Sequence, residues 1–391
     1  IWFLPAHCVV LMCLALCLAT TACQQDVVSG DATMQLTFSH DSLLFDTVFT
    51  EMGSSTKRMM VYNDNPTALL IDRVEMKNGE VFFINLDGEN QLENLRDITL
   101  RGGDSLFLFV RADIDPLSSD SPVLLEDTIT FHVNGKAQHI YLQAYGQDVE
   151  VIRSPEKFIQ YDYLRLNSKK PYLIFDTLVV AGRLSIDPGA TLYMHTGSMI
   201  YVYGSLSAKG TKEKPIVIRG DRMDMLFDSV PYRVASGQWN GLYLVHLSDW
   251  AQPKYELNYI DVLSGSIGIY AMSENADRRP KMTLSNARIH NHSIYGLVLQ
   301  NIDAEVVNTE ISNCASYCVY LAGGQHQFVH NTIASYFGYP YTTINIHNNI
   351  LREDVAAVYI NNLSKNKAPT NSSFYNCIIT GARKNNIVVA T

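Results

Sequence analysis

Apolar and polar residues alternate in short runs along most of the chain, and this period of two predicts strands. Over residues 255–391 the runs follow a repeated unit in which an apolar position and an Asn precede Ile, as in LSNARI and VVNTEI. The repeated asparagines are Asn258, Asn286, Asn308, Asn331, Asn348 and Asn376. Their spacing averages about 24 residues, which is the length of one turn of a solenoid.

Strands that recur once per turn predict a parallel β-coil, in which each turn buries its apolar face against the turns on either side. An Asn at a bend tolerates left-handed backbone, and its amide can bond the next Asn of the stack. We therefore expect the six asparagines to form a structural ladder. The alternative is that Asn is simply common in loops.

Residues 171–219 carry short strand-like runs separated by glycines. Glycine permits the positive φ that tight bends need. With its DPGATL and GSLSAKGT turns, this stretch resembles the opening turns of right-handed parallel β-helix proteins of the pectate-lyase-like fold. The resemblance implies a right-handed parallel β-helix over residues 171–391 and says little about activity. The strand-like end, NNIVVAT, leads us to expect that the native coil continues beyond Thr391.

Upstream, residues 34–148 contain about eight short strand-like runs separated by turn signals such as NDNP and RGGDS, a pattern typical of an immunoglobulin-like sandwich. The pieces FDTVFTEMGSSTKRMMVYN and LQAYGQDV resemble the Ig-like modules of Bacteroidota surface proteins and, more distantly, the major sperm protein family. That resemblance implies a spacer or a binding domain. Regular alternation is lost over residues 149–170, which we interpret as a junction between the sandwich and the coil.

The first 22 residues form an apolar run that ends in small residues, as a secretory signal does. Small residues, then Cys23 and a polar stretch, resemble a bacterial lipobox of the loose Bacteroidota type, in which the Cys is acylated. The resemblance implies an exported protein anchored by lipid on Cys23 to the outer membrane or cell surface, with residues 23–33 as a tether. The chain lacks an initiator Met and a basic segment here, so we expect the native N-terminus to lie upstream.

Charge and cysteine content narrow the possible functions. The chain has 30 basic and 39 acidic residues and a formal charge of −9, which makes nucleic acid an unsuitable partner. Four of the seven cysteines lie within the first 23 residues. The other three, Cys314, Cys318 and Cys377, are too few for a disulfide framework, and we expect buried thiols. A bridge between Cys314 and Cys318 is the alternative.

The strongest acidic group is Asp221, Asp224 and Asp228, with Arg222 beside it, in or next to a stretch at residues 221–238 that interrupts the repeat. Polysaccharide lyases on the resembled fold use acidic Ca²⁺ ligands and a basic residue, so a Ca²⁺ site and catalysis are implied alternatives here. Glycoside hydrolases instead need two carboxyl groups about 5 to 10 Å apart. Since Asp commonly makes turn and cap interactions, we favour a structural role.

An aromatic loop follows at residues 336–341, with Tyr336, Phe337, Tyr339 and Tyr341. Exposed rings on a rigid coil are suited to stacking on sugar faces, although such rings can also cover the side of the coil. His326 and His330 are four residues apart, but no third ligand stands at a fixed spacing, so we predict no metal site.

Together these patterns predict an all-β protein, with an N-terminal Ig-like sandwich followed by a right-handed parallel β-helix. We interpret it as a lipid-anchored binding or structural module, with the membrane as a partner, glycans as the candidate ligand and no cofactor. The alternatives are a polysaccharide lyase or glycoside hydrolase that uses a groove of the coil, and a passive adhesin or stalk. Catalysis would place Asp, Glu and Arg together in a groove beside residues 221–238.

Overall fold

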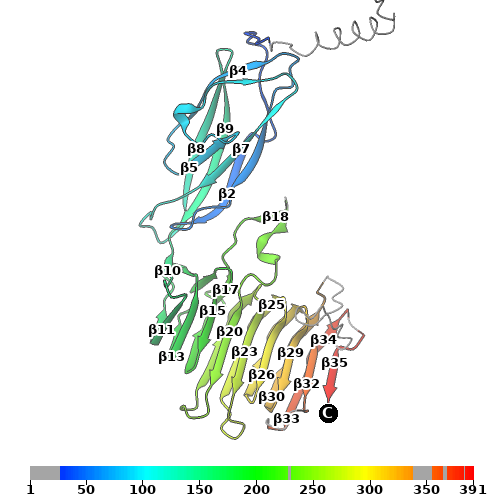
Figure 1. Ribbon diagram of the computed structural model, residues 1–391. Helices are drawn as coiled ribbons and strands as arrows, with labels where there is room; N and C mark the ends of the chain where they lie inside the picture. The colour runs from blue at the N-terminus through cyan, green and yellow to red at the C-terminus, as the bar shows by residue number, and fades with distance from the viewer. Residues whose placement is uncertain (1–26, 228–229, 338–354, 364–367, 383) are drawn as a thin grey trace, which may run out of the picture. The chain divides into compact units, whose positions relative to one another are not determined.

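The computed structural model describes residues 27–227, 230–337, 355–363, 368–382 and 384–391 (Figure 1). The chain forms two compact units, one made of Ile1–Leu117 and Val123–Gly146 and the other of Ser118–Pro122 and Gln147–Thr391. Almost all regular structure in the described residues is β. No helix among them is long and apolar enough to cross a membrane. The predicted signal segment and Cys23 lie outside the described residues.

The first unit contains two sheets that share one hydrophobic core. One sheet has the order β1 (Thr37–Phe38), β3 (Lys57–Tyr62), β7 (Ser105–Ala112), β5 (Phe82–Leu86). The other has the order β2 (Ser42–Phe49), β9 (Lys136–Gln147), β8 (Val123–Val133), β4 (Leu69–Met76), β6 (Arg96–Leu100). Antiparallel pairs such as β3 with β7 and β8 with β9 build both sheets. Alternate residues, including Val61 and Leu108 from one sheet and Phe131 and Ile140 from the other, are fully buried in the shared core.

The second unit is built from large parallel sheets, as the period-two runs and their recurrence predicted. A nine-stranded sheet contains β10 (Glu150–Ile152), β12 (Tyr172–Ile174), β14 (Thr191–Met194), β17 (Ile216–Gly220), β22 (Ile260–Leu263), β25 (Arg288–His292), β28 (Glu310–Cys314), β31 (Thr332–Ser335) and β34 (Ile378–Gly381). A fifteen-stranded sheet divides at β13 (Thr177–Ile186), whose first half pairs with β15 and whose second half pairs with β16.

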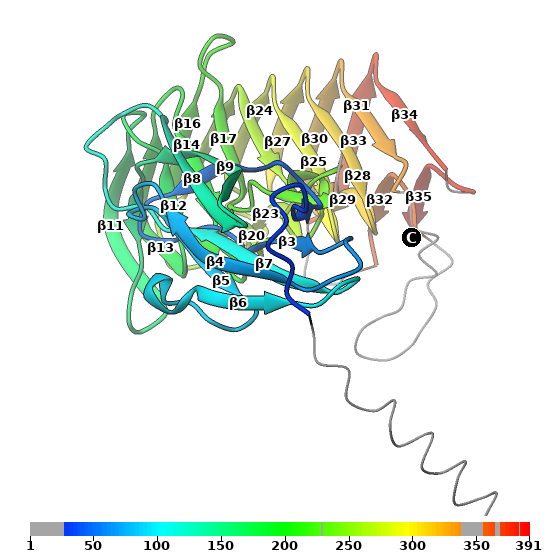
Figure 2. The ribbon, with the colours of Figure 1, turned by 90° about the horizontal axis from the view of Figure 1, so that it is seen from above.

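The two arms of this larger sheet are named here by their outward side chains. The groove ladder runs through β16 (Ser205–Lys209), β21 (Lys254–Asn258), β24 (Lys281–Ser285), β27 (Asp303–Val307), β30 (Gly324–Val329) and β33 (Thr370–Tyr375). The tyrosine ladder runs through β15 (Met199–Val202), β20 (Gly241–His246), β23 (Ile267–Ser273), β26 (Tyr295–Gln300), β29 (Tyr317–Ala322), β32 (Val358–Asn361) and β35 (Ile387–Ala390). One turn of the chain, such as β24, β25 and β26, passes through the groove ladder, the nine-stranded sheet and the tyrosine ladder in that order. Successive turns stack as a β-helix-like solenoid (Figure 2).

Columns of apolar side chains fill the inside of the coil, because each strand pairs in register with its counterpart in the next turn. One column comprises Val180, Val202, Leu244, Ala271, Leu299 and Leu321, all of them fully buried. Burial stabilises by roughly 25 cal/mol per Å² of apolar surface, so every turn depends on its neighbours for stability.

The coil begins earlier than the sequence suggested. Residues 149–170, interpreted above as a junction, form β10 and β11 (Phe158–Leu166), which pair in parallel with β12 and β13. A register shift between Tyr161 and Tyr163 interrupts β11. That bulge breaks the strict alternation of inward and outward residues, which explains why the strand pattern was missed.

The predicted asparagine ladder is continuous over three turns. The Nδ2 of Asn286 donates to Oδ1 of Asn258 at 2.8 Å, and the Nδ2 of Asn308 donates to Oδ1 of Asn286 at 2.7 Å. Asn286, Asn308 and Asn376 all have positive φ, between 47° and 52°. The bend therefore uses both properties of Asn, its tolerance of left-handed backbone and its stackable amide.

The expectation of one column of six asparagines is wrong at Asn258 and at Asn331. Asn258 pairs with Ser285, and the left-handed residue of its turn is Tyr259, with φ 45°. Thr332 pairs with Glu310, so Asn331 lies beside Thr309, and its amide donates to the carbonyl of Val306 at 2.8 Å. The left-handed position of that turn belongs instead to His330, with φ 56°. The shift by one residue arises because the bend needs a single left-handed residue, and His can occupy it. Asn348 lies outside the described residues.

Candidate functional site

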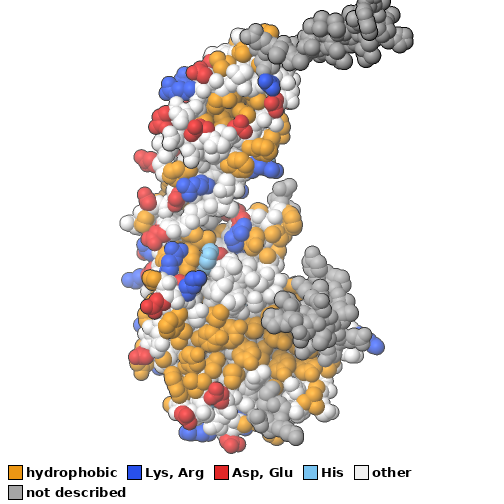
Figure 3. Space-filling view, viewed as in Figure 1, with side chains coloured by type: hydrophobic (Ala, Val, Ile, Leu, Met, Phe, Trp, Pro, Cys, Tyr) orange, Lys and Arg blue, Asp and Glu red, His pale blue; other side chains and the backbone are white. Residues whose placement is uncertain are grey.

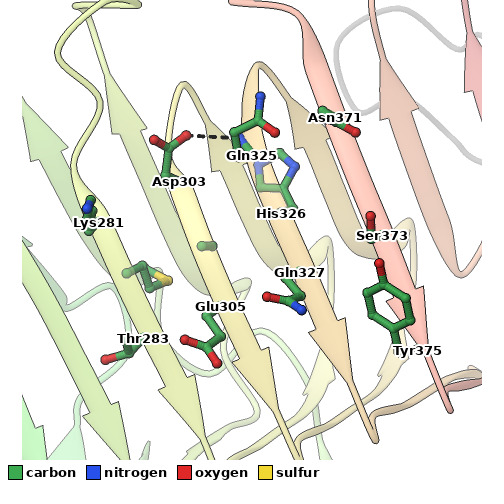
Figure 4. A pocket seen from close by; sticks show the side chains of 12 residues that line it. Lys281, Thr283, Asp303, Glu305, Gln325, His326, Gln327, Asn371, Ser373 and Tyr375 are labelled. Atoms are coloured by element: carbon green, nitrogen blue, oxygen red, sulfur yellow. Dashed lines mark hydrogen bonds between the residues drawn. The ribbon is translucent and has the colours of Figure 1, made fainter.

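A polar hollow of about 380 Å³ lies on the outer face of the groove ladder, over β24, β27, β30 and β33 (Figure 4). The alternation of inward and outward side chains along each strand creates this hollow. Met282 and Ala304 face the core, which turns their neighbours Lys281, Thr283 and Glu305 outward.

Parallel register arranges the outward side chains in two rows that cross the strands. The first row contains Lys281, Asp303, Gln325 and Asn371, and the second contains Thr283, Glu305, Gln327 and Ser373. Neighbours in a row are separated by one strand spacing of roughly 4.8 Å. Amide, carboxylate, hydroxyl and ammonium groups from four turns therefore converge on one surface.

Most of these side chains have no partner among the residues that the structure describes. Asp303 is engaged, because Nε of Arg279 lies 2.7 Å from its Oδ1 and the backbone N–H of Gln325 donates to the same atom at 2.9 Å. Within the described residues, the side chains of Lys281, Glu305, Gln327 and Asn371 make no hydrogen bond or ion pair. Their polar groups face solvent and are available to a ligand.

A buried histidine lies beneath these rows. Nδ1 of His326 is 3.0 Å from the hydroxyl of Ser372, whereas its buried Nε2 has no hydrogen-bond partner among the described residues. Burial lowers the pKa of His326 to about 4, with the nearby carboxylate of Asp303 opposing that effect. The imidazole is therefore neutral at pH 7, and it adds no charge under the hollow.

The predicted acidic group is divided between different partners. Asp221 is buried and its Oδ2 lies 2.6 Å from Nδ1 of His195, while Asp224 accepts a 2.7 Å hydrogen bond from Nε of Arg222. Desolvation raises the pKa of Asp221, and the hydrogen bond with His195 opposes the rise. Asp228 lies outside the described residues, and within them no three His, Cys, Asp or Glu side chains converge as a metal site requires.

The segment at residues 221–238 has structure of its own and stands out from the coil at β18 (Figure 1). β18 (Met225–Phe227) pairs with β19 (Val230–Pro231), and a short 3-10 helix, η2 (Tyr232–Val234), follows. The side-chain amide of Gln238 donates to the carbonyls of Tyr232 and Ala235 within the segment, and the backbone N–H of Gln238 donates to the carbonyl of Ser264 in the coil at 2.9 Å. These contacts fit the structural role that the sequence favoured for this stretch.

Only part of the predicted aromatic loop can be placed. Tyr336 is 54% exposed, and its hydroxyl lies 2.7 Å from the hydroxyl of Thr380. Phe337 is partly buried, and Tyr339 and Tyr341 lie outside the described residues. A sugar-stacking platform formed by this loop remains a prediction.

Sequence reasoning missed a column of tyrosines on the tyrosine ladder, where hydrophobic side chains gather on the surface (Figure 3). The rings of Tyr201 and Tyr243 are 4.7 Å apart, those of Tyr243 and Tyr270 are 5.6 Å apart, and Tyr320 stacks on Tyr359 at 5.5 Å. Rings that stack on one another cover much of each other's faces. The signal was a Tyr at the same place in successive turns, as in MIYV, GLYL and GIYA.

The cysteines and histidines behave as structural residues. Cys314 and Cys318 are buried free thiols, and burial raises the pKa of Cys314. His326 faces the core while His330 occupies an exposed bend, so the two do not share a site. His292 is fully buried with its Nε2 3.1 Å from the carbonyl of Val262, and burial lowers its pKa to about 4.

Comparison with known proteins identifies no family for this chain. No family model matches the sequence, and no curated protein matches it. Similar solved structures include a family 123 glycoside hydrolase from Clostridium perfringens, described as acting on glycolipid glycans, with a TM-score of 0.22 and 7% identity over 30% of this chain and 26% of that one.

Two further structures are similar at the same level. The Vibrio cholerae VesB protease has a TM-score of 0.21 and 14% identity over 29% of this chain and 32% of its own. The E. coli chaperone DraB has a TM-score of 0.21 and 14% identity over 31% of this chain and 56% of its own. The matches thus span from about a quarter to just over half of those chains, and similarity at this level carries no argument about function.

Proposed function

We propose that this protein is an exported, lipid-anchored surface protein in which an Ig-like sandwich carries a right-handed parallel β-helix that binds glycans. Export and the anchor on Cys23 rest on the N-terminal sequence pattern. The Ig-like and β-helix assignments rest on the sequence resemblances, together with the two sheets around one core and the stacked parallel turns.

The observation that carries glycan binding is the pair of polar rows over β24, β27, β30 and β33. Glu305, Gln327 and Asn371 are exposed and make no hydrogen bond within the described residues, yet the rigid strands hold them at fixed spacing. Sugar hydroxyls both donate and accept hydrogen bonds, so carboxylate and amide side chains complement them. Since the backbone is already ordered, binding costs little conformational entropy.

The shape of the surface also suits an extended sugar chain better than a compact ligand. The hollow crosses four turns of the coil. Tyr375, which is 53% exposed, borders it on β33 and provides an aromatic face for the C–H groups of a sugar ring.

Catalysis is the second candidate, because Asp303 and Glu305 both face outward from β27. Side chains two residues apart on a strand lie roughly 7 Å from each other, within the range of carboxyl pairs in inverting glycoside hydrolases. However, Asp303 is held by Arg279 and by the backbone of Gln325, which leaves one carboxylate without a partner. Binding without turnover is therefore the better-supported function.

The test is calorimetric binding to a panel of soluble plant and host polysaccharides. We expect Gln327→Ala and Glu305→Gln each to weaken binding about tenfold, the loss of one or two hydrogen bonds. Glu213→Gln, which changes an exposed carboxylate outside the hollow, is the matched control and should bind normally. If no polysaccharide binds, the passive stalk or adhesin is correct, and release of shortened sugars would establish the enzyme.

The lipid anchor needs a separate experiment. Replacing Cys23→Ala should release the protein from the membrane fraction into the soluble fraction, because the acylated side chain is removed. Retention of the variant in membranes would contradict the anchor.

A further inference from the structure

A second hollow, of about 570 Å³, lies toward the other end of the groove ladder. Its lining comes from the bulge of β11, from the corners where β13 bends and β15 leads into β16, and from the chain just before β21. Its main residues are Asp162, Tyr163, Gly182, Gly204, Trp250 and Gln252. None of these belongs to the polar rows described above.

Two glycines give this hollow a floor without side chains. An ideal Cβ on Gly204 would lie 1.6 Å from the carbonyl oxygen of Gly182, and a Cβ on Gly182 would lie 2.6 Å from that of Asp162. Adjacent turns approach so closely here that only Gly fits. The same constraint leaves bare backbone between two aromatic side chains.

The two aromatic walls are exposed. Tyr163 is 78% exposed and Trp250 is 41% exposed. Trp250 is nevertheless held in place, because its ring packs 5.8 Å from that of Tyr203 and its backbone N–H donates to the carbonyl of Leu247 at 3.1 Å. Single exposed rings are common, but two of them lining one hollow form a local apolar surface of the kind that marks contact sites.

Charge around the hollow limits the chemistry of an occupant. Asp162 provides a carboxylate that makes no hydrogen bond within the described residues. Arg183 pairs in register with both Tyr163 and Ser205, and Lys254 follows in the same row. The Nζ of Lys254 is paired with Glu256 at 2.9 Å, so Arg183 is the cation that stands next to Tyr163 in the register. Its charge disfavours an organic cation, which the aromatic pair and a carboxylate would otherwise suit. A sugar ring meets both features, with a C–H face for the rings and hydroxyls for Asp162.

The hollow also continues the line of the proposed glycan site. Arg183, Ser205, Lys254 and Lys281 occupy one register row of the groove ladder, and Lys281 begins the polar rows. Ser205 and Lys281 are two strand spacings apart, roughly 10 Å. An unbranched chain lying along the ladder therefore meets both places.

We propose that the hollow between Tyr163 and Trp250 is a second sugar subsite, so that the coil binds a single linear glycan along the groove ladder. This inference rests on the proposed glycan function and adds the length and direction of the ligand. Binding at both places makes affinity depend on chain length, because the second contact becomes intramolecular once the ligand spans the gap.

The experiment compares a disaccharide with an octasaccharide of each of four polymers, β-1,4-linked glucose, xylose and mannose and α-1,4-linked galacturonate, on the full chain. Trp250→Ala should weaken octasaccharide binding about tenfold and leave disaccharide binding in the polar rows unchanged. Gln327→Ala should weaken both. Tyr141→Ala, which removes a 59% exposed ring from the first unit, is the matched control and should change neither.

Tryptophan fluorescence provides a second readout that does not depend on whether Trp250→Ala folds. Trp239 is 1% exposed and Trp2 lies in the predicted signal segment, so a change in indole emission on octasaccharide binding reports Trp250. Trp250→Phe keeps an aromatic ring beside Tyr203 and should remove that emission change while keeping most of the affinity.

The two proposals fail in different ways. If neither oligosaccharide of any polymer binds the unaltered protein, the glycan function itself is wrong. If both lengths bind equally well and Trp250→Ala changes neither, the polar rows bind glycan alone and the second subsite is overturned.

Discussion

The groove ladder and the tyrosine ladder are two arms of one parallel sheet, joined through β13, yet their outer faces differ. On the tyrosine ladder the outward side chains pack on one another: Tyr243 stacks on Tyr201 and makes a tilted ring contact with Tyr270. On the groove ladder Glu305 and Gln327 stand side by side without bonding. Identical backbone geometry thus supports both a self-packed surface and a row of available groups, and a ligand is expected where side chains remain unsatisfied.

The pKa of an outward tyrosine also indicates that the tyrosine ladder is packed. Burial among neighbouring rings raises the pKa of the Tyr243 hydroxyl, with nearby Tyr201 adding to the rise. The hydroxyl is thus partly desolvated, as expected where outward rings pack against one another. We therefore assign the tyrosine ladder to stability, and the proposed function assigns the groove ladder to binding.

The largest loss of stability is expected from a substitution at Gly204, at the corner between the two arms. In Gly204→Ala the new methyl group would lie 1.6 Å from the carbonyl oxygen of Gly182, so the turns cannot approach. We expect a loss of more than about 4 kcal/mol in the free energy of unfolding of the coil, measured by urea denaturation. Both surfaces should be damaged together.

Gly197→Ala is the matched control for that change. An ideal Cβ on Gly197 has nothing within 4 Å, but its φ of 83° is unfavourable for Ala. The strain should cost only about 1 to 2 kcal/mol. Equal losses for the two variants would show that close approach of the turns is not what requires Gly204.

A smaller loss of stability, which depends on pH, is expected from His326 beneath the groove ladder. His326 has a pKa of about 4 in the folded protein and about 6.5 when unfolded, so the unfolded chain binds the additional proton between these values. Stability is therefore complete above pH 6.5 and falls as pH drops toward 4. At about 1.4 kcal/mol per unit, His326 contributes at most about 3 kcal/mol to this loss.

His326→Gln removes that contribution, because Gln does not titrate. The variant should lose less stability than the unaltered protein between pH 7.5 and pH 4.5, measured as the change in urea midpoint. A residual slope is expected from His292, whose pKa burial also lowers to about 4. Identical slopes in both proteins would mean that His326 is protonated without cost and is not sealed beneath the groove.

The sequence predicted features that repeat within single turns and missed features built across turns. Alternation and the recurring Asn-Ile unit indicated parallel stacking, since both lie within a turn. The polar hollow escaped notice because its members extend from Lys281 to Tyr375, and their alignment depends on register and on loop lengths between turns. One-residue shifts, as at Asn331, or a bulge, as at Tyr161, cannot be read from spacing alone.

The predicted site residues show the same limit. Asp221 and Asp224 are close in sequence, and their proximity left a shared ligand as the alternative to the structural role that we favoured. The structure turns Asp221 toward His195 and Asp224 toward Arg222, because the chain leaves the coil between them. Local clustering of charge is thus a weaker guide to a site than alignment between turns.

The smallest expected effect is also the most direct comparison of the two ladders. Tyr243→Ala removes a half-buried ring that packs against both Tyr201 and Tyr270, and it should reduce the free energy of unfolding by about 1 to 3 kcal/mol while glycan binding is unchanged. Gln327→Ala removes an exposed side chain that has no partner in the described part of the chain, so stability should change by less than about 0.5 kcal/mol while binding weakens. Denaturation and calorimetry on the same two variants measure both quantities. Loss of binding in Tyr243→Ala, with Gln327→Ala unaffected, would move the ligand to the tyrosine ladder and reverse the assignment of the two surfaces.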